Sequence, residues 1–448
     1  MILRRTIRFL DRRAGVAPLA KKALRYVFPD HWTFLLGEIA LYAFVVLVGT
    51  GIYLTFFFEP SLQQVVYRGG YGPLYGLRVS EAYKSVVDLS FQTKAGLVMR
   101  QTHHWAADVF IVAIVLHVLR VFFTGAFRKP RDLIWIVGVL MLMSALLEGF
   151  LGYSLVDDLL SGMGLAIAYG VVLSVPVIGG SLALLVWGAP FPGAHEFESR
   201  MYIGHVLLLP VAIGGLLALH LGLLVTRHHT QFRGPRRTEG RVVGRPAFPG
   251  YAPRSLALFF AVAAVLFLLG GLVQINPVWQ WGPYDVSQGT NGAQPDWYLG
   301  WLIGGLRLMP GFDVTIGDYT LVPNAFWAGA AFPLVVFGLM LAWPALERRI
   351  TGDHTPHNLL DRPRDSPWRT ATGAAFFTWV ASVFLAGSSD RVFVSFDVSY
   401  TAQIWFWRCA LVVAPVLVWF VTRRVCEELR EERPPEDAGA RRSLPDAR

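Results

Sequence analysis

The chain has 448 residues, of which 54% are hydrophobic and 16% are charged, and it carries a formal net charge of +9. Soluble domains average about 25% charged residues, so this composition excludes a disordered chain and argues against a soluble fold. Most of the cations lie between apolar runs, where they set membrane topology rather than bind nucleic acid. The two cysteines, Cys409 and Cys426, form no Cys-x-x-Cys pair, which excludes thiolate-held iron–sulfur clusters and an attached c-type haem.

Eight apolar runs reach the roughly 20 residues that a helix needs to cross a bilayer. They cover 32–58, 97–123, 133–155, 201–226, 252–274, 322–343, 370–387 and 403–422. We therefore predict an all-α polytopic membrane protein with eight transmembrane helices. The basic segment 1–31 precedes a run that is too long for a signal peptide and lacks a cleavage site, so it is interpreted as cytoplasmic.

A ninth apolar stretch, 162–188, is also long enough to cross, but Pro176, Gly179 and Gly180 interrupt it. Without it, the loop 227–251 with its six arginines falls on the cytoplasmic side, together with both termini, as the positive-inside rule requires. We therefore predict that 157–188 forms a hairpin on the outer side. A true ninth span is the alternative.

Five of the eleven histidines lie inside apolar runs, where an imidazole is costly and usually functional, and four of them form two spaced pairs. His103 and His117 are 14 residues apart on the second span, and His205 and His220 are 15 apart on the fourth. Such spacings return to within about 60° of one helix face, about 21 Å further along the axis. Both spans run from outside to inside, so His103 pairs with His205 near the outer surface and His117 with His220 near the inner one.

Two stacked bis-histidine sites predict two b haems in an N-terminal four-helix bundle. A bis-histidine iron has no open axial position, so it transfers electrons instead of binding oxygen. The alternative is four separate histidines that hydrogen-bond to neighbouring helices. Zinc is disfavoured because carboxylates and thiols are missing at these depths.

The other two helices of the bundle support haem. Gly37 and Gly51 on the first span, and Gly138 and Gly152 on the third, are each 14 residues apart. Glycine lets a flat macrocycle approach the backbone, although it also serves helix packing.

Two arginines flank the histidines of the second span. Arg100 lies three residues before His103, and Arg120 lies three residues after His117. These positions suit carboxylate partners such as haem propionates, with interfacial snorkelling as the alternative.

The chain resembles cytochrome b of the quinol–cytochrome c reductase complexes along nearly its whole length. The resemblance is carried by the four-His, four-Gly pattern and by the strings Arg100-Gln-Thr-His-His-Trp105, Gly152-Tyr-Ser-Leu155 and Gln294-Pro-Asp-Trp-Tyr298. The strings Phe28-Pro-Asp-His-Trp32 and His229-Thr-Gln-Phe232 are similar to the actinobacterial menaquinol branch.

Four features depart from relatives of this family. The 15-residue spacing of the second histidine pair is similar to the chloroplast type, but Leu36 stands where that type tethers a third haem, so none is predicted. Asp296 replaces the usual Glu of the Pro-Glu-Trp-Tyr motif, and Val156 replaces a usual Pro, which leaves the shape of that turn open.

The resemblance implies a Q-cycle: (mena)quinol is oxidised at an outer site, and electrons cross two b haems to an inner quinone site, with proton translocation. It implies a Rieske iron–sulfur subunit, a cytochrome c-type subunit, a homodimer, contact with membrane lipid, a haem–copper terminal oxidase as a further partner, and a bacterial cell membrane location. The expected regions are a haem bundle over 32–232, a cytoplasmic linker over 233–251, a C-terminal four-helix domain with the outer quinol loop over 252–422, and a cytoplasmic tail over 423–448.

Asp296 is the carboxylate that we expect to accept a quinol proton, since burial beside Trp297 would raise its pKa toward working pH. Tyr298 would hydrogen-bond the same head group. The alternative is that Asp296 only caps the short helix that follows it.

For the inner quinone site we expect His31, Trp32, Arg227 and His229 to contribute, with His229 as a proton donor. The alternative is a basic surface run that binds anionic lipid.

Two other classes of protein remain as rivals. The cytochrome b anchor of another membrane oxidoreductase generally has four or five spans and one quinone site, and the Asp296 motif argues against it. A proton-coupled transporter predicts inverted repeats, and the sequence contains no recognisable internal repeat.

Overall fold

The structure is a computed structural model that describes residues 21, 23–194, 196–288, 296–389, 393 and 395–431. Most of the basic N-terminal segment, the start of the Asp296 motif and most of the C-terminal tail, namely 1–20, Gln294, Pro295 and 432–448, lie outside the described residues.

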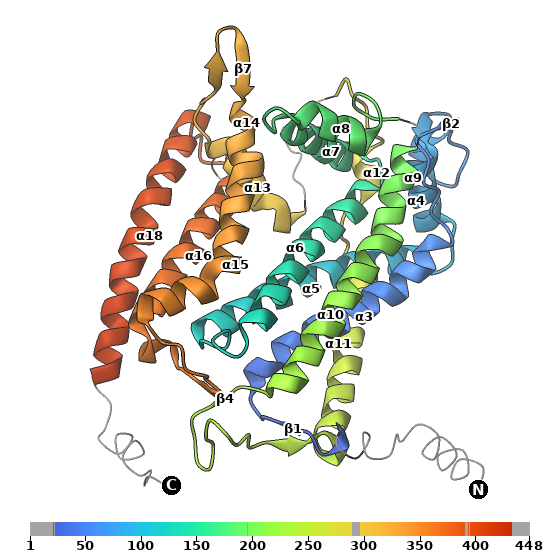
Figure 1. The fold of residues 1–448 in the computed structure, drawn as a ribbon. Coiled ribbons are helices and arrows are strands. Elements are labelled where there is room, and N and C mark those ends of the chain that lie inside the picture. Colours follow the sequence, from blue (N-terminus) through green and yellow to red (C-terminus); the bar gives the residue numbers. More distant parts are fainter. Residues whose placement is uncertain are drawn as a thin grey trace, which may run out of the picture.

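Within the described part of the chain, eight helices are long and apolar enough to cross a membrane, which confirms the prediction of eight spans. They run over Trp32–Thr55, Gly96–Phe123, Asp132–Ser154, Phe197–Arg227, Ala247–Leu272, Asn324–Thr351, Pro367–Ser388 and Tyr400–Glu431. Their main helices are α3 (Leu35–Thr55), α5 (Gly96–Phe123), α6 (Asp132–Ser154), α10 (Leu209–Arg227), α11 (Ala252–Leu272), α15 (Phe332–Thr351), α16 (Pro367–Ser388) and α18 (Tyr400–Glu431) (Figure 1). Shorter segments open four of the spans: η1 (Trp32–Phe34), α9 (Phe197–Ile203) with η3 (Gly204–Leu208), η4 (Ala247–Tyr251), and α14 (Asn324–Phe326) with η6 (Trp327–Ala331).

The ninth apolar stretch does not form a spanning helix. It folds into α7 (Leu159–Leu173) and α8 (Gly179–Trp187), which pack against each other near one end of α6 (Figure 1). A 15-residue helix rises only about 23 Å, less than the roughly 30 Å of a bilayer core. Pro176 and Gly179 break the helix, and the turn exposes Val177. The expected hairpin is therefore present.

The first helical group contains α3, α5, α6, α10 and α11. Helix α3 packs on α5, α10 packs on α6, and α11 packs against both α3 and α5. Small buried side chains such as Ala40, Ala43 and Ala106 form the contact between α3 and α5, which lets the two backbones approach closely, as in other membrane helix pairs. This packing leaves room for cavities between the pairs.

The second helical group contains α13 (Gly300–Leu308), α15, α16 and α18, with α18 at its outer edge (Figure 1). A buried ion-pair cluster ties it to the first group. Arg369 on α16 contacts Glu347 on α15 at 2.7 Å and Asp361 at 3.0 Å, and Asp361 also pairs with Arg128 at 2.9 Å. Arg128 follows α5, so the cluster fixes the two groups to each other at one end.

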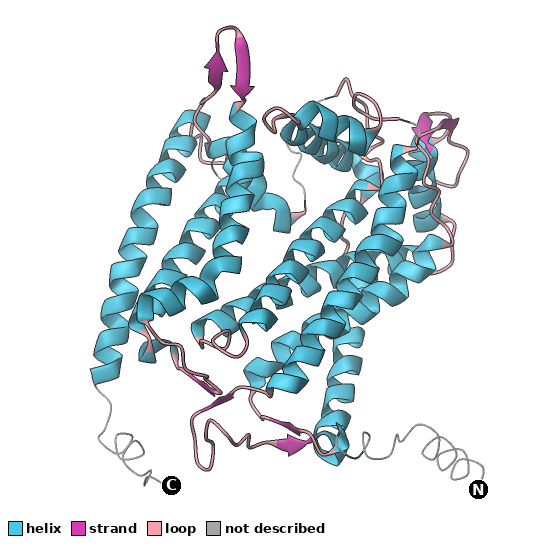
Figure 2. Cartoon of the chain, viewed as in Figure 1, coloured by secondary structure: helices cyan, strands magenta, loops and turns pink. Residues whose placement is uncertain are grey.

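Short strands and helices close the two ends of the helices (Figure 2). At the α7/α8 end lie the pair β2 (Gln64–Val66) and β3 (Arg78–Ser80), helices α4 (Glu81–Phe91) and α12 (Val278–Trp281), and the hairpin β6 (Val314–Ile316) and β7 (Tyr319–Val322). At the opposite end, β1 (Val27–Phe28) pairs antiparallel with β5 (Arg245–Pro246), and β4 (Gln231–Phe232) pairs parallel with β8 (Leu359–Leu360). The remaining short turns are η2 (Gly72–Leu74), η5 (Trp297–Leu299) and η7 (Pro363–Asp365).

Candidate functional site

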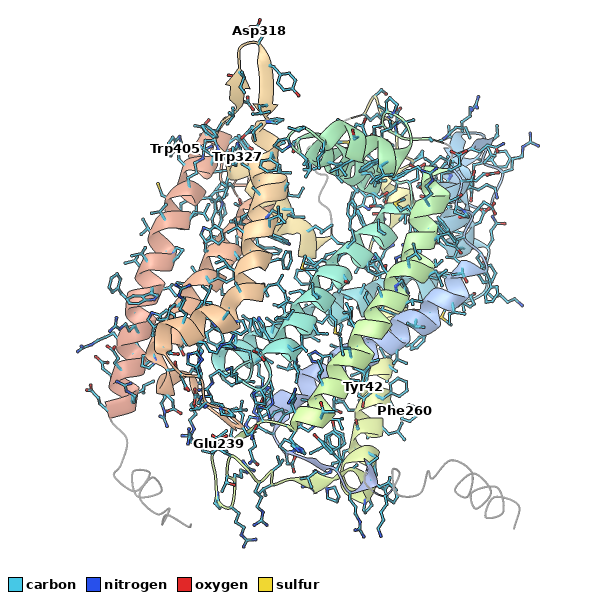
Figure 3. The ribbon with its side chains drawn as sticks, in the orientation of Figure 1. Tyr42, Glu239, Phe260, Asp318, Trp327 and Trp405 are labelled. Atoms are coloured by element: carbon cyan, nitrogen blue, oxygen red, sulfur yellow. The ribbon has the colours of Figure 1, made fainter. Side chains whose placement is uncertain are left out.

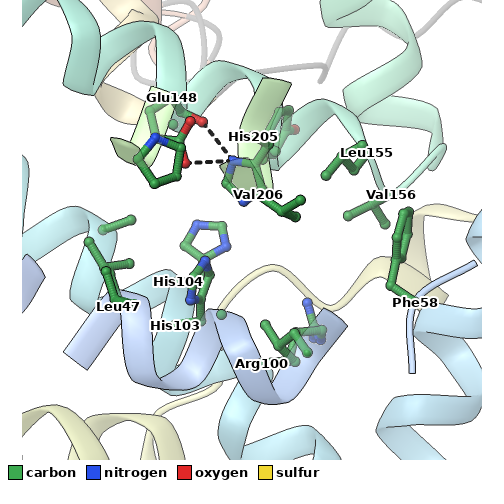
Figure 4. A pocket seen from close by; sticks show the side chains of 18 of the residues that line it. Leu47, Phe58, Arg100, His103, His104, Glu148, Leu155, Val156, His205 and Val206 are labelled. Atoms are coloured by element: carbon green, nitrogen blue, oxygen red, sulfur yellow. Dashed lines mark hydrogen bonds and ion pairs between the residues drawn. The ribbon is translucent and has the colours of Figure 1, made fainter. Parts of the chain in front are cut away.

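The first cavity, called the His103 cavity here, lies in the first helical group toward the α7/α8 end and measures about 260 Å³ (Figure 4). Helix α5 contributes His103, and the π-helical turn η3 contributes His205. The two ring centroids are 6.2 Å apart and the ring planes are at 81°. The imidazoles thus face one another across the cavity, as the sequence predicted for this pair.

The Nδ1 atom of each imidazole contacts a hydrogen-bond acceptor on a neighbouring helix, Thr50 on α3 for His103 and Glu148 on α6 for His205. The Thr50 hydroxyl donates to the Val46 carbonyl at 2.7 Å, so it accepts from Nδ1–H of His103 at 2.9 Å. His205 Nδ1 lies 3.2 Å from the Glu148 carbonyl and 3.0 Å from its carboxylate (Figure 4). These bonds place the proton on Nδ1 and the lone pair on Nε2, which is the tautomer that binds a metal.

A second cavity, called the His117 cavity here, lies toward the opposite end of the same helices and measures about 390 Å³. Its lining includes His117 from α5, His220 from α10 and Arg120. His103 and His205 thus line one cavity and His117 and His220 line the other, because the two histidines of each pair lie at similar positions along neighbouring helices.

Each of the four glycines singled out in the sequence faces one imidazole. A Cβ atom would lie 3.2 Å from His103 at Gly51, 2.4 Å from His205 at Gly152, 3.2 Å from His117 at Gly37 and 3.5 Å from His220 at Gly138. A side chain would crowd the ring at Gly152, Gly37 and Gly51, whereas an added Cβ at Gly138 would make an ordinary van der Waals contact. The four glycines thus belong to the two cavities, two to each.

Each cavity is lined by one arginine that has unpartnered nitrogens among the described residues. Arg100 Nη1 donates to the Asn276 carbonyl at 3.1 Å, but its Nε and Nη2 have no hydrogen-bond partner among the described residues. Arg120 has the same two nitrogens unpartnered within the described chain, and its guanidinium lies 4.2 Å from the ring centre of Phe34. A buried guanidinium without acceptors is costly, so both arginines are poised to bind an anionic group.

Three side chains that can donate or accept protons form a hydrogen-bonded cluster at the edge of the His103 cavity, on the side of α13. Asp296 accepts a hydrogen bond from the Tyr298 hydroxyl at 3.0 Å, and its other oxygen lies 3.1 Å from His104 Nε2. All three residues line the cavity. Burial and the neighbouring Asp296 carboxylate raise the pKa of Tyr298 well above its usual value, so its hydroxyl stays a donor. Asp296 does not cap the next helix with its side chain.

Several comparisons bear on these cavities. A family model described as Cytochrome b(N-terminal)/b6/petB matches residues 108–283. The cytochrome bc1 complex cytochrome b subunit of Streptomyces coelicolor is 45% identical over 416 residues, which cover 93% of this chain and 76% of that protein. The corresponding subunit of Mycobacterium tuberculosis is 47% identical over 426 residues, which cover 95% and 77%. This chain belongs to the cytochrome b subunits of the cytochrome bc1 complex.

The fold of this cytochrome b agrees with that assignment. A solved chain described as "Hyperthermophilic respiratory Complex III" matches 94% of this chain and 99% of its own length, with a TM-score of 0.69 and 18% identity. At that identity the match shows the fold alone. The sequence relatives come from Streptomyces, Mycobacterium and Corynebacterium, which confirms the resemblance to the actinobacterial branch.

The turn after Gly152 takes a defined shape in this cytochrome b without the usual proline. Val156 packs against a buried cluster around Tyr67, and Asp157 adopts a left-handed backbone with φ of 55°. Asp158 caps α7 by accepting from Ser161 N–H at 2.8 Å. Burial raises the pKa of Asp157 to about 7 and that of Asp158 to about 6, so both acids titrate near neutral pH beside the His103 cavity.

The structure of this cytochrome b does not bring together the four residues that were expected at the inner quinone site. His229 lines the His117 cavity, whereas His31, Trp32 and Arg227 are outside the described lining of that cavity. His31 accepts from Thr33 N–H at 3.3 Å, and Trp32 is 70% exposed. Of the four, His229 is therefore the residue that lines the His117 cavity.

The sequence reasoning did not assign roles to three residues that the structure places at the sites: His104, Glu148 and Thr50. His104 follows His103 directly, and an intramembrane histidine of this kind is a recognisable signal. Glu148 is likewise an acid within an apolar run. Thr50 offers no such signal, because hydroxyls are common on membrane helices.

Proposed function

We propose that this chain oxidises quinol beside Asp296 at the edge of the His103 cavity and reduces quinone at the edge of the His117 cavity, next to the two haem positions. It does so as the cytochrome b subunit of a respiratory quinol–cytochrome c oxidoreductase. One observation carries the proposal: two cavities in one bundle share the same set of two histidines, two glycines and one arginine whose Nε and Nη2 have no hydrogen-bond partner in the described part of the chain. Neither separate structural histidines nor a transporter would require this duplication.

The donor set fits two b haems. His103 and His205 would hold one and His117 and His220 the other, with the glycines making room and with Arg100 and Arg120 binding propionates. When bound, a bis-histidine haem supplies one-electron transfer at an iron that is closed to oxygen. The unpartnered Arg nitrogens support this, since a carboxylate is the acceptor they lack.

At the His103 cavity the chain's own residues handle the proton. Tyr298 holds the Asp296 carboxylate through one oxygen, and His104 contacts the other. Asp296 would accept the proton that a quinol hydroxyl releases, while the Tyr298 hydroxyl orients the carboxylate. Asp157, with its pKa raised to about 7 by burial, offers a second acceptor nearby.

The proposal also assigns each cavity to one side of the membrane and names the partner subunits of this chain. The His103 cavity faces outward and the His117 cavity faces the cytoplasm, together with both termini of the chain. The family assignment implies a Rieske subunit and a cytochrome c-type subunit as partners. A homodimer, association with a haem–copper oxidase and the use of menaquinol follow from the actinobacterial resemblance. The regions 32–232 and 252–422 would then be the haem bundle and the C-terminal domain with its outer loop.

The test replaces Asp296 in the purified complex. Asp296→Asn keeps the shape and a hydrogen-bonding group but removes the base, so quinol:cytochrome c turnover should fall by about 100- to 10,000-fold. Asp296→Glu should retain much of the rate. Asp285→Asn, in an exposed loop on the same side, is the matched control and should be neutral.

Haem absorbance should be unchanged in all three variants, because none of them replaces a residue that contacts one of the four proposed haem-ligating imidazoles. If Asp296→Asn turns over at the parent rate across the pH range, the proton acceptor lies elsewhere, and Asp157 becomes the next residue to replace.

A further inference from the structure

A carboxylate on α3 borders the His117 cavity, directly after Gly37. Glu38 accepts a hydrogen bond from the Ser255 hydroxyl at 2.7 Å, and its other oxygen accepts from the Tyr251 hydroxyl. The Tyr42 hydroxyl donates to Ser255 and lies 3.4 Å from the same Glu38 oxygen. All four residues line the cavity, so the carboxylate and the three hydroxyls around it face the same space as His117.

The position of this group connects the cavity with one membrane end. Glu38 lies in the first turn of α3, and Tyr251 and Ser255 lie at the start of α11. Two helix N-termini favour a negative charge there. Figure 3 labels Tyr42 between the lower parts of the helices, on the same side as the loops that carry Glu239. The hydroxyl cluster therefore lies toward the end of the bundle at which α3 and α11 begin.

The other titratable candidate at this cavity is a poorer proton donor. Phe28 stacks on Tyr251 with ring centroids 3.9 Å apart and lies 5.0 Å from His229, so it separates the two groups. Burial, together with the charges of Arg131 and Arg120, lowers the pKa of His229 to about 4. His229 is thus neutral at pH 7 and carries no imidazolium proton to give.

We infer that Glu38 delivers protons to a quinone reduced in the His117 cavity, with Tyr42, Tyr251 and Ser255 as its hydrogen-bonded route to water. The inference rests on the proposed function and assigns a proton-delivering residue to its second cavity. Reduction of one quinone consumes two protons and two electrons. Two quinol oxidations at the other cavity supply those electrons, one each, while the second electron of each quinol goes to the Rieske subunit. Each proton forms an O–H bond at a former carbonyl oxygen, and Glu38 regains its proton from water.

A purely structural role would make Glu38 a clamp between α3 and α11. The two roles differ in one respect. Holding α3 and α11 together requires only that Glu38 accept hydrogen bonds, whereas proton transfer to a quinone requires that Glu38 gain and lose a proton. Glu38→Gln keeps the shape and one acceptor but removes proton exchange.

The experiment uses the purified complex with Asp296→Asn as the background, which slows quinol oxidation at the His103 cavity. Added 2,3-dimethyl-1,4-naphthoquinol then reduces the b haems mainly from the His117 cavity, and stopped-flow absorbance follows this reduction. The reaction runs in the reverse direction there, so Glu38 accepts the protons that the naphthoquinol releases. Adding Glu38→Gln should slow this reduction by about 100-fold with haem content and static spectra unchanged. Glu428→Gln, in an exposed ion pair on α18, is the control and should match the background.

Equal rates with and without Glu38→Gln would overturn the inference. If Glu38→Gln loses haem or fails to assemble, Tyr251→Phe replaces it, because it removes one donor and keeps the ring. That variant should slow reduction by about tenfold, and an unchanged rate would refute the route. If the intact complex does not oxidise the naphthoquinol, the proposed function fails; if it does and Glu38→Gln matches its background, only this inference fails.

Discussion

The two glycines of α6 offer a quantitative test of the haem assignment, because the structure gives them different amounts of space. An added Cβ at Gly152 would lie 2.4 Å from Cε1 of His205, whereas one at Gly138 would lie 3.5 Å from Cε1 of His220. Carbon atoms in contact prefer about 3.5 to 4.0 Å. Gly152→Ala therefore requires the His205 ring to move by roughly 1 Å, which exceeds the approximately 0.5 Å tolerance of a preorganised site.

We expect Gly152→Ala to lose the haem of the His103 cavity and Gly138→Ala to keep both haems. Alanine is favoured over glycine within a helix by about 1 kcal/mol, so neither substitution weakens α6 itself. A loss at Gly152 would thus report on the imidazole and not on the helix.

The assay is the ratio of haem b to protein from the pyridine haemochrome, together with reduced-minus-oxidised spectra of the purified complex. Gly152→Ala should give about half the haem of the parent, and Gly138→Ala the full amount. The reasoning is refuted if Gly152→Ala retains both haems with parent spectra, or if the two variants lose haem equally.

Two further predictions concern the axial histidines. His220→Leu should lose the haem of the His117 cavity alone, so haem content should halve while the spectrum of the remaining haem is kept; retention of both haems would disprove the pairing. Glu148→Gln removes a charge-assisted hydrogen bond to His205, worth about 1 to 2 kcal/mol, or roughly 40 to 90 mV for one electron. Because the carboxylate makes the imidazole more basic and so favours oxidised iron, redox titration should find the outer haem potential raised, with the other haem unmoved; no shift, or a fall, would contradict the role.

The sequence by itself determined the membrane architecture, because spanning length and helical periodicity are local properties. Eight apolar runs predicted the eight spans, and Pro176 and Gly179 with the distribution of arginines showed that 157–188 does not cross. The 14- and 15-residue spacings placed His103 and His220 on interior faces, and the motifs identified the family. These conclusions needed no knowledge of which helices touch.

Only the tertiary structure decided which side chains meet across helices. His104 contacts Asp296 although 192 residues separate them, and Glu38 contacts Ser255 across 217. No local pattern encodes such contacts, since they depend on helix rotation and on loops that fold back. For the same reason the sequence could not tell that the side chain of His31 caps a helical turn instead of lining the His117 cavity.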